Sequence, residues 1–214
     1  MPKLPFVYRT IGKGACLYHV YQEAFGPLSF NNSGKGSRRF DPIEDINGDI
    51  IPSYYAAFSV LVALNETVVR VDRNGISTLS WSPDTQQTID EAQRQGITQI
   101  STKRVLKLID MNSFVEKLTE QPLSDLLKQG AAAYPQLHVY ATYLAVNYPK
   151  AQGLIWDSYQ RNTPGERAIV FYGDRVTARD FEFMSGDWIN EPHNRDHLRD
   201  TIRSLNINIP DWLL

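Results

Sequence analysis

The segment IPSYYAAFSVLVALNET, residues 51–67, constrains the fold of this chain more than any other, because it is almost wholly apolar. Its most apolar part, roughly Tyr54 to Leu64, is too short to cross a bilayer, which takes about 20 residues in a helix. Its alanines and leucines, with apolar side chains on more than one face, predict a buried helix from about Ser53 to Asn65. A helix that is buried on several faces needs a surrounding core, so the segment indicates a globular protein.

The composition allows one globular domain and excludes several functional classes. The 214 residues are 42% hydrophobic and 11% aromatic, which is enough for a packed core. The formal charge of -2 gives no basic footprint, so we expect no direct binding to nucleic acid. The single cysteine, Cys16, excludes an internal disulfide and a CxxC metal site, and it is typical of a reducing compartment. Because the first ten residues also lack the apolar core of a signal peptide, we expect a cytoplasmic protein without a membrane partner.

Turn-forming residues divide the rest of the chain into short elements. We expect strands at Phe6–Thr10, Val68–Val71, Gly153–Ser158 and Ala168–Gly173, helices at Leu137–Asn147 and from Pro83-Asp84 to near Gly96, a short element after Ser101-Thr102, a turn at Asn74-Gly75, and irregular, glycine-rich chain up to Phe40. The C-terminal NIPDWLL is expected to dock on the core or, alternatively, to bind a partner. Because helices and strands do not alternate in regular βα units, the fold class expected is α+β rather than a doubly wound sheet.

Two Gly-x-Gly sequences precede charged candidates without forming a nucleotide-binding loop. Gly12-Lys13-Gly14 and Gly34-Lys35-Gly36 both lack the full phosphate-loop and dinucleotide motifs, so we interpret them as flexible turns. The second is followed by Arg38 and Arg39, whose planar guanidinium groups suit paired phosphate oxygens. The alternative is a solvated surface pair. Arg9, at the end of the first expected strand, is likewise either an anion ligand or an ordinary edge charge.

Glu66, near the end of the long apolar segment, is the leading candidate for a catalytic residue. It lies eleven residues after Tyr55, which is three turns along one helical face, so both side chains would point into one cleft. The alternative is a carboxylate at a frayed, solvated helix end. Ser158 would act as a nucleophile, hold a sugar hydroxyl or simply end its strand, and no GxSxG surrounds it. His193 and His197 stand four residues apart without an HExxH motif, so we expect no metal site.

These candidates occur in an order that resembles a known family. Tyr8-Arg9 is followed by Arg39-Phe40-Asp41, then by Tyr55-Ala56-Ala57 and the segment Ala63 to Thr67, and finally by Trp156-Asp157-Ser158 and Ile169-Val170-Phe171. The order resembles the RES domain, named for an arginine, a glutamate and a serine, which serves as the toxin in many bacterial toxin–antitoxin pairs. The resemblance covers residues 6–176, about the core of one domain, and leaves 177–214 as its C-terminal extension. The loop between Arg39 and Tyr55 is longer than the family pattern, and the segment from Asn74 to Pro135 is expanded.

The resemblance implies both a fold and a chemistry. The fold is an ADP-ribosyltransferase-like split sheet with surrounding helices, and the substrate held in its cleft is NAD, without a metal. The arginine, glutamate and serine of the family correspond to Arg39, Glu66 and Ser158, while Arg9 and Tyr55 match further pocket positions. Arg39 and Arg9 would clamp the pyrophosphate. Tyr55 would pack on the nicotinamide or ribose, and Ser158 would hold a polar substrate edge. Glu66 would stabilise the positive charge that develops on the ribose when the glycosidic bond breaks.

The function that the resemblance implies is an NAD-degrading toxin that cleaves the nicotinamide–ribose bond. It would act as a glycohydrolase, with water as acceptor, or as a phosphorylase, with phosphate as acceptor. A mono-ADP-ribosyltransferase that modifies a protein target is one alternative, and a catalytically silent binding module with the same fold is another. The resemblance also implies a cognate antitoxin, of the helix-turn-helix type, that inhibits the toxin by covering its cleft, for example by inserting its own chain end.

Overall fold

The structure, a computed structural model, describes residues 7–34, 38–71, 77–79, 94–158, 166–189 and 191–204. Its main feature is an eight-stranded sheet in the order β1-β7-β8-β9-β3-β2-β6-β10, in which β7 and β8 are parallel and all other neighbours are antiparallel. The strands are β1 (Tyr8–Ile11), β2 (Cys16–Gln22), β3 (Ser53–Ala57), β6 (Gln95–Thr102), β7 (Leu106–Asp110), β8 (Gly153–Asp157), β9 (Arg167–Tyr172) and β10 (Phe181–Trp188). Two short strands, β4 (Val69–Val71) and β5 (Ser77–Leu79), form a separate hairpin.

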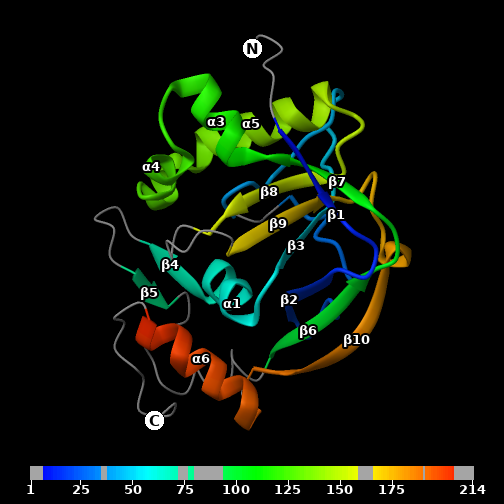
Figure 1. The fold of residues 1–214 in the computed structure, drawn as a ribbon, viewed down its shortest axis with the longest axis vertical. Helices are drawn as coiled ribbons and strands as arrows, with labels where there is room; N and C mark the ends of the chain where they lie inside the picture. Colours follow the sequence, from blue (N-terminus) through cyan, green and yellow to red (C-terminus); the bar gives the residue numbers. More distant parts are fainter. Residues whose placement is uncertain are drawn as a thin grey trace.

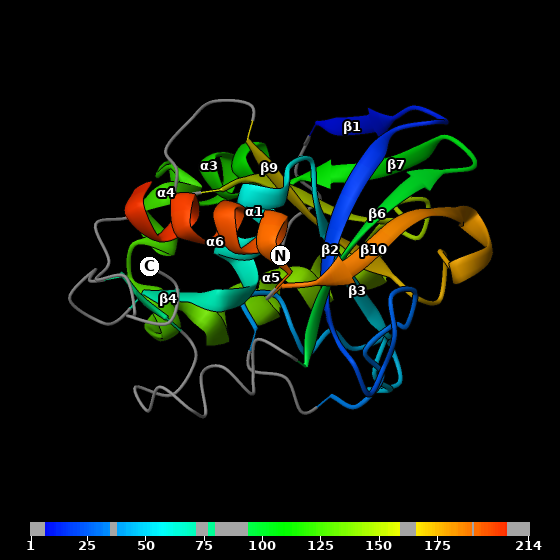
Figure 2. The same ribbon diagram turned by 90° about the horizontal axis from the view of Figure 1, so that it is seen from below.

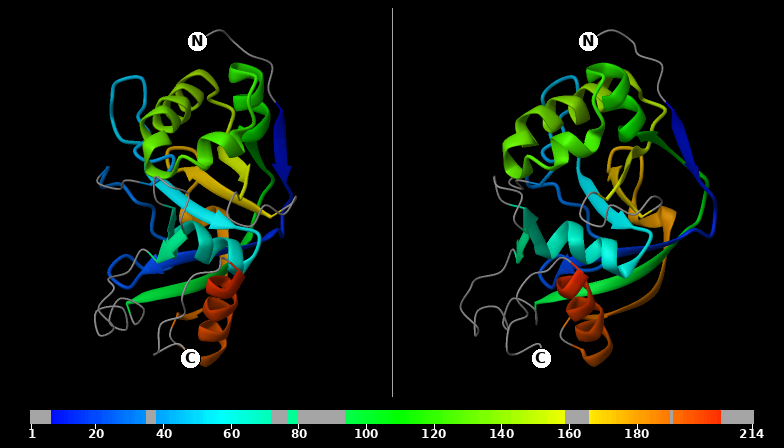
Figure 3. Two further views of the ribbon diagram at one scale, coloured as in Figure 1. Left: turned by 90° about the vertical axis from the view of Figure 1, so that its left-hand side faces the viewer. Right: turned by 60° about the vertical axis from the view of Figure 1, so that its left-hand side comes forward.

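Helices are grouped at the two ends of the molecule, with one helix between them (Figure 1). The helices are α1 (Val60–Val68), α3 (Met111–Thr119), α4 (Leu123–Leu127), α5 (Tyr134–Asn147) and α6 (Pro192–Ser204), together with the 3-10 helices η1 (Gly130–Ala133) and η3 (Ala178–Asp180). Helices α3, α4 and α5 lie together at one end, α6 lies at the other, and α1 lies between the two groups (Figures 1 and 3). Helix α6 packs against α1 (Figure 2).

The alternation of side chains along the strands divides the core into two clusters, one on each face of the sheet. The first cluster contains the buried residues of the helices, such as Leu64, Phe114 and Leu137, together with strand residues that face them. The second consists of strand and loop residues, and it joins Ile100 of β6 to Leu108 of β7. Since β6 and β7 lie near opposite ends of the strand order, the sheet must curl for them to share a cluster.

The sheet is split between β2 and β3. The two strands are paired at a single position, Tyr18 with Ala57, whereas β2 pairs with β6 along all of its seven residues. The side chain of His19 partly replaces the missing ladder, because its Nδ1–H donates to the carbonyl oxygen of Tyr55 at 2.5 Å. The α+β prediction is therefore confirmed, and the split corresponds to the split sheet that the family resemblance implied. No helix among the described residues is long and apolar enough to cross a membrane.

The sequence prediction of one helix from about Ser53 to Asn65 is wrong. Residues 53–57 form the central strand β3, and the helix begins only at Val60. Ser59 marks the boundary, because its Oγ accepts from the N–H of Val62 and its carbonyl oxygen accepts from that of Ala63, as an N-cap does. The alanines that favoured a helix instead point to opposite faces of β3, where Ala57 is buried in the first core cluster and Ala56 in the second.

Other expected elements have mixed outcomes. The strands expected near residues 6–10, 68–71, 153–158 and 168–173, the helix at 137–147 and an element after residue 102 are all confirmed within a few residues. The irregular chain expected before Phe40 is wrong, since it contains β2, and Gly96 lies in strand β6 rather than at a helix end. The body of that expected helix, the turn at Asn74-Gly75 and the segment NIPDWLL lie outside the described residues. Strand β10, from the expected C-terminal extension, joins the sheet edge beside β6.

Candidate functional site

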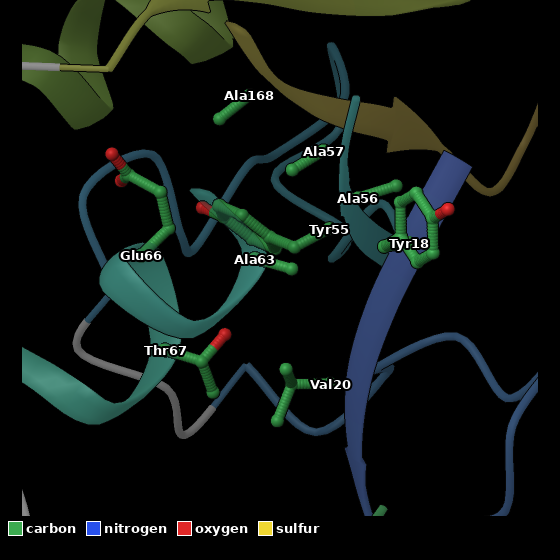
Figure 4. A pocket seen from close by; sticks show the side chains of 9 residues that line it. All are labelled: Tyr18, Val20, Tyr55, Ala56, Ala57, Ala63, Glu66, Thr67 and Ala168. Atoms are coloured by element: carbon green, nitrogen blue, oxygen red, sulfur yellow. The ribbon is translucent and has the colours of Figure 1, made fainter. Parts of the chain in front are cut away.

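A pocket opens where the sheet splits (Figure 4). Its lining comes from both sides of the split and from the helix above it: Tyr18 and Val20 of β2, Tyr55, Ala56 and Ala57 of β3, Ala63, Glu66 and Thr67 of α1, and Ala168 of β9. The short side chains of the alanines make this surface apolar and leave room for a flat ring. The Tyr55 hydroxyl and the Glu66 carboxylate lie on the same side of the pocket and provide its polar end (Figure 4).

Glu66 is held by hydrogen bonds and an ion pair. Its Oε1 accepts from the hydroxyl of Ser158 at 2.8 Å, and its Oε2 lies 3.1 Å from Nη1 of Arg39. The side chain of Glu66 is only 8% exposed, and that of Arg39 only 10%. A carboxylate so removed from water needs such partners, because an unpaired charge in the interior is costly. The two contacts fix the orientation of the carboxylate and leave its remaining lone pairs to the pocket.

Arg39 reaches Glu66 because the loop that carries it is tied to the core on either side. The backbone N–H of Phe40 donates to the hydroxyl oxygen of Tyr55 at 3.2 Å. The fully buried ring of Phe40 packs on Trp156, with ring centroids 4.7 Å apart. On the N-terminal side, Nε2–H of His138, from α5, donates to the carbonyl oxygen of Arg38 at 2.8 Å. The guanidinium of Arg39 is thus directed inward rather than to solvent.

Ser158 lies directly after β8, and its backbone N–H donates to the carbonyl oxygen of Glu166 at 2.8 Å. This bond extends the β8–β9 ladder by one step, so the residue is 2% exposed although it follows the last residue of the strand. Its hydroxyl donates to Glu66, which lies 92 residues away in the sequence. Because its hydroxyl donates to a carboxylate, Ser158 is oriented as a hydrogen-bonding group. No histidine among the described residues contacts it to activate it as a nucleophile.

Tyr55 forms the wall of the pocket opposite α1, and aromatic and cationic groups hold its ring. The edge of Trp156 meets it at a centroid distance of 6.2 Å, and the guanidinium carbon of Arg38 lies 5.2 Å from its centroid. Burial raises the pKa of the Tyr55 hydroxyl well above its usual value. The phenol therefore stays neutral at physiological pH, and it accepts from Phe40 while its own proton remains available to a ligand.

The structure brings four of the five predicted site residues together, namely Arg39, Tyr55, Glu66 and Ser158. Arg9 lies apart from them on the edge strand β1, and its Nε is 2.7 Å from Oδ2 of Asp110. Its role as a pyrophosphate ligand stays a prediction. The geometric reason given for the meeting of Tyr55 and Glu66 is wrong, because they do not share a helix. They meet because β3 turns directly into α1, which folds back over the strand.

Sequence reasoning missed the contribution of β2. Tyr18 and Val20 line the pocket, and His19, on the opposite face, holds the backbone of Tyr55. Their signal was the run LYHVY, in which aromatic and β-branched residues are typical of a strand. Burial lowers the pKa of His19 to about 3, so its ring is neutral. The two histidines considered for a metal lie on α6, where Nε2 of the exposed His193 is 3.7 Å from Oδ2 of Asp187. The described residues contain no cluster of metal ligands.

Comparison with known proteins identifies the family and a related fold. The RES domain matches residues 9–185 of the chain. Among solved structures, the crystal structure of the M. tuberculosis MbcT-MbcA toxin-antitoxin complex has a similar fold, with a TM-score of 0.52 and 14% sequence identity over 84% of this chain and 86% of that chain. No curated protein matches the sequence. At so low an identity the likeness to the solved structure shows the fold alone, but the domain match spans most of the sequence. The chain therefore belongs to the RES domain family.

Proposed function

We propose that this protein is an NAD-consuming toxin that breaks the bond between nicotinamide and ribose. The observation that carries the proposal is the buried group formed by Arg39, Glu66 and Ser158 beside the ring of Tyr55. These are the three residue types after which the family is named, and they meet at the polar end of an apolar pocket. An apolar pocket with a few convergent polar groups is the usual form of a small-molecule site.

The residues suit this reaction without a general acid. When the glycosidic bond breaks, its electron pair stays with the nicotinamide nitrogen, which was cationic, so a neutral nicotinamide leaves and positive charge develops at the ribose. Glu66, fixed by Arg39 and Ser158, provides a preorganised negative charge for that transition state. Water or phosphate then adds to the ribose carbon through an oxygen atom. The proton on that oxygen is lost to solvent before or after the bond forms. Tyr55 offers its ring to the nicotinamide and its hydroxyl proton to the sugar.

We further propose that a protein antitoxin controls this activity by covering the pocket. The supporting observation is that the structurally similar MbcT chain was crystallised in a toxin-antitoxin complex. An enzyme that consumes NAD without restraint would deplete the cell that makes it, so such a site needs a partner that blocks it. Growth on induced expression tests this part: wild type is expected to arrest growth, and Glu66→Gln is expected not to. Equal arrest by both variants would show that the toxicity does not depend on catalysis.

The deciding experiment measures nicotinamide released from NAD by the purified protein, with and without phosphate. Wild type should release nicotinamide, and Glu66→Gln should be slower by about a hundredfold or more, because it removes the charge at the ribose. Glu182→Gln, at an exposed carboxylate on β10, is the matched control and should keep full activity. ADP-ribose as product indicates hydrolysis, and a phosphorylated ADP-ribose indicates phosphorolysis. A labelled protein band from labelled NAD indicates ADP-ribosyl transfer, and no release under any condition overturns the proposal.

A further inference from the structure

Arg38 and Arg39 are neighbours in the sequence, but they have different surroundings. The guanidinium of Arg39 is nearly buried, and Glu66 neutralises its charge at 3.1 Å. The side chain of Arg38 is half-buried, and its guanidinium lies over the ring of Tyr55, 5.2 Å from the centroid. Within the described part of the chain, no carboxylate forms an ion pair with Arg38. The charge of Arg39 is therefore neutralised inside the protein, whereas that of Arg38 has no such ion-pair partner among the described residues.

Three groups that face Arg38 are affected by its charge without forming an ion pair with it. The carboxyl of Asp41 is buried and accepts a hydrogen bond from the hydroxyl of Ser53 at 2.6 Å, and burial raises its pKa. His19 is neutral, since burial lowers its pKa to about 3, and the phenol of Tyr55 is neutral as well. Each of these three groups lies close enough to Arg38 to be affected by its charge. The positive charge of Arg38 thus lies beside Tyr55, which lines the pocket, without an ion-pair partner among the described residues.

The backbone of Arg38 is held in place while its side chain stays accessible. Its carbonyl oxygen accepts from Nε2–H of His138 at 2.8 Å and from the N–H of Asp41 at 3.3 Å. The contact with Tyr55 favours a position of the guanidinium over the ring and uses none of its N–H groups, because a cation over a ring is attracted to the ring face. A pre-oriented guanidinium with unused donors is a strong ligand for paired anionic oxygens.

We infer that Arg38, rather than Arg39, binds the diphosphate of the substrate and sets the specificity of the site for phosphorylated nucleotides. The inference rests on the proposed function, since it places the ribose beside Glu66 and the nicotinamide against Tyr55. In a dinucleotide the first phosphate follows that ribose by a few bonds, and Arg38 is the described cation that lies on Tyr55 without a carboxylate partner. Arg39 serves Glu66 and is a positioning residue for the catalytic carboxylate.

The test measures binding rather than turnover, so that it does not depend on the reaction. ADP and adenosine are titrated by calorimetry into wild type, Arg38→Gln, Arg38→Lys and Arg39→Gln, with Arg179→Gln, at an exposed position on η3, as the matched control. Loss of a charge-assisted pair of hydrogen bonds should weaken ADP binding to Arg38→Gln by about 10- to 100-fold. Adenosine affinity should not change in that variant. Arg38→Lys should be intermediate, because it keeps the charge but loses the planar fork.

Three outcomes would overturn the inference: ADP binding equal to wild type in Arg38→Gln, loss of ADP binding in Arg39→Gln instead, or no ADP binding by wild type. Thermal unfolding of Arg38→Gln within about 2 °C of wild type is expected, since no ion pair is broken, and it shows that any loss of affinity is local. Kinetics give a second readout: Arg38→Gln should raise KM for NAD with kcat nearly unchanged, and it should not affect nicotinamide riboside, which has no phosphate. If wild type binds ADP through Arg38 but releases no nicotinamide, the proposed function fails and the inferred anion site stands.

Discussion

Replacing one partner of the Arg39–Glu66 pair should destabilise the protein far more than replacing both. The two charges are 3.1 Å apart, and each side chain is about one-tenth exposed. At an effective dielectric constant of about 20, two unit charges at this distance attract by about 5 kcal/mol before the desolvation cost is subtracted. Removing one partner leaves the other buried without a counter-charge, and such changes typically cost about 3 kcal/mol or more. Removing both charges together avoids that penalty.

The assay is a double-mutant cycle with Glu66→Gln, Arg39→Met and the double variant, followed by urea and thermal unfolding. We expect each single variant to lose about 3 kcal/mol of unfolding free energy, which corresponds to a decrease of about 9 °C in Tm for a chain of this size. The double variant should lose only about 1 to 2 kcal/mol, so the coupling energy, which is the sum of the two single losses minus the double loss, should be about 4 to 5 kcal/mol. Added salt should change the coupling little, because a buried pair is weakly screened. A double variant whose loss equals the sum of the single losses would refute the reasoning.

Three further predictions concern residues that support the site. Burial lowers the pKa of His19 to about 3 in the folded protein, whereas the unfolded chain protonates it near pH 6.5, so the stability that depends on the neutral ring is complete above pH 6.5 and is lost as pH falls. Between about pH 7 and pH 5, the unfolding free energy of wild type should therefore fall by about 2 kcal/mol more than that of His19→Gln. Equal pH dependence of the two proteins in urea unfolding would contradict this. Ser158→Ala should reduce nicotinamide release by about 10- to 100-fold while unfolding free energy falls by only about 1 kcal/mol, and an unchanged rate would remove Ser158 from the site. Gly153→Ala should destabilise the protein by about 3 kcal/mol, because its new Cβ would lie 2.1 Å from the carbonyl oxygen of Val170; a Tm equal to that of wild type would show that β8 and β9 can separate without cost.

The residues that meet at the candidate site could be predicted from the sequence better than their geometry. Residue types in a fixed order pointed to Arg39, Tyr55, Glu66 and Ser158, and the structure places these four together. The argument that joined Tyr55 to Glu66 failed, because spacing along a chain gives a distance only within one regular element. Ser59, between them, caps a new helix and breaks the element in two. The signal was visible as a serine in an apolar run, but alanine and leucine outweighed it.

Contacts across the sheet could not be read from the sequence at all. Ser158 reaches Glu66 across 92 residues, and His138 reaches the carbonyl oxygen of Arg38 across 100. The first contact depends on the strand order, in which β9 lies beside β3 and β8 beside β9 although both follow β3 by about a hundred residues. The second depends on where α5 packs. Strand β2 was missed for a related reason. Its run LYHVY favours a strand, but its place in the sheet depends on its pairing with β6, and the sequence does not show that partner.

The different surroundings of Arg38 and Arg39 match the charge distribution of the proposed substrate. NAD carries a positive nicotinamide ring and a negative diphosphate, so a pocket of one sign would repel one end. Since Arg39 and Glu66 together are neutral, a cationic ring can approach the carboxylate without facing a net positive charge. Arg38, outside that pair, adds its positive charge beside the ring of Tyr55, where the proposed site would hold the phosphates. A single arginine bound to both anions would divide its charge between the phosphate and Glu66, whereas two adjacent arginines provide one cation for each.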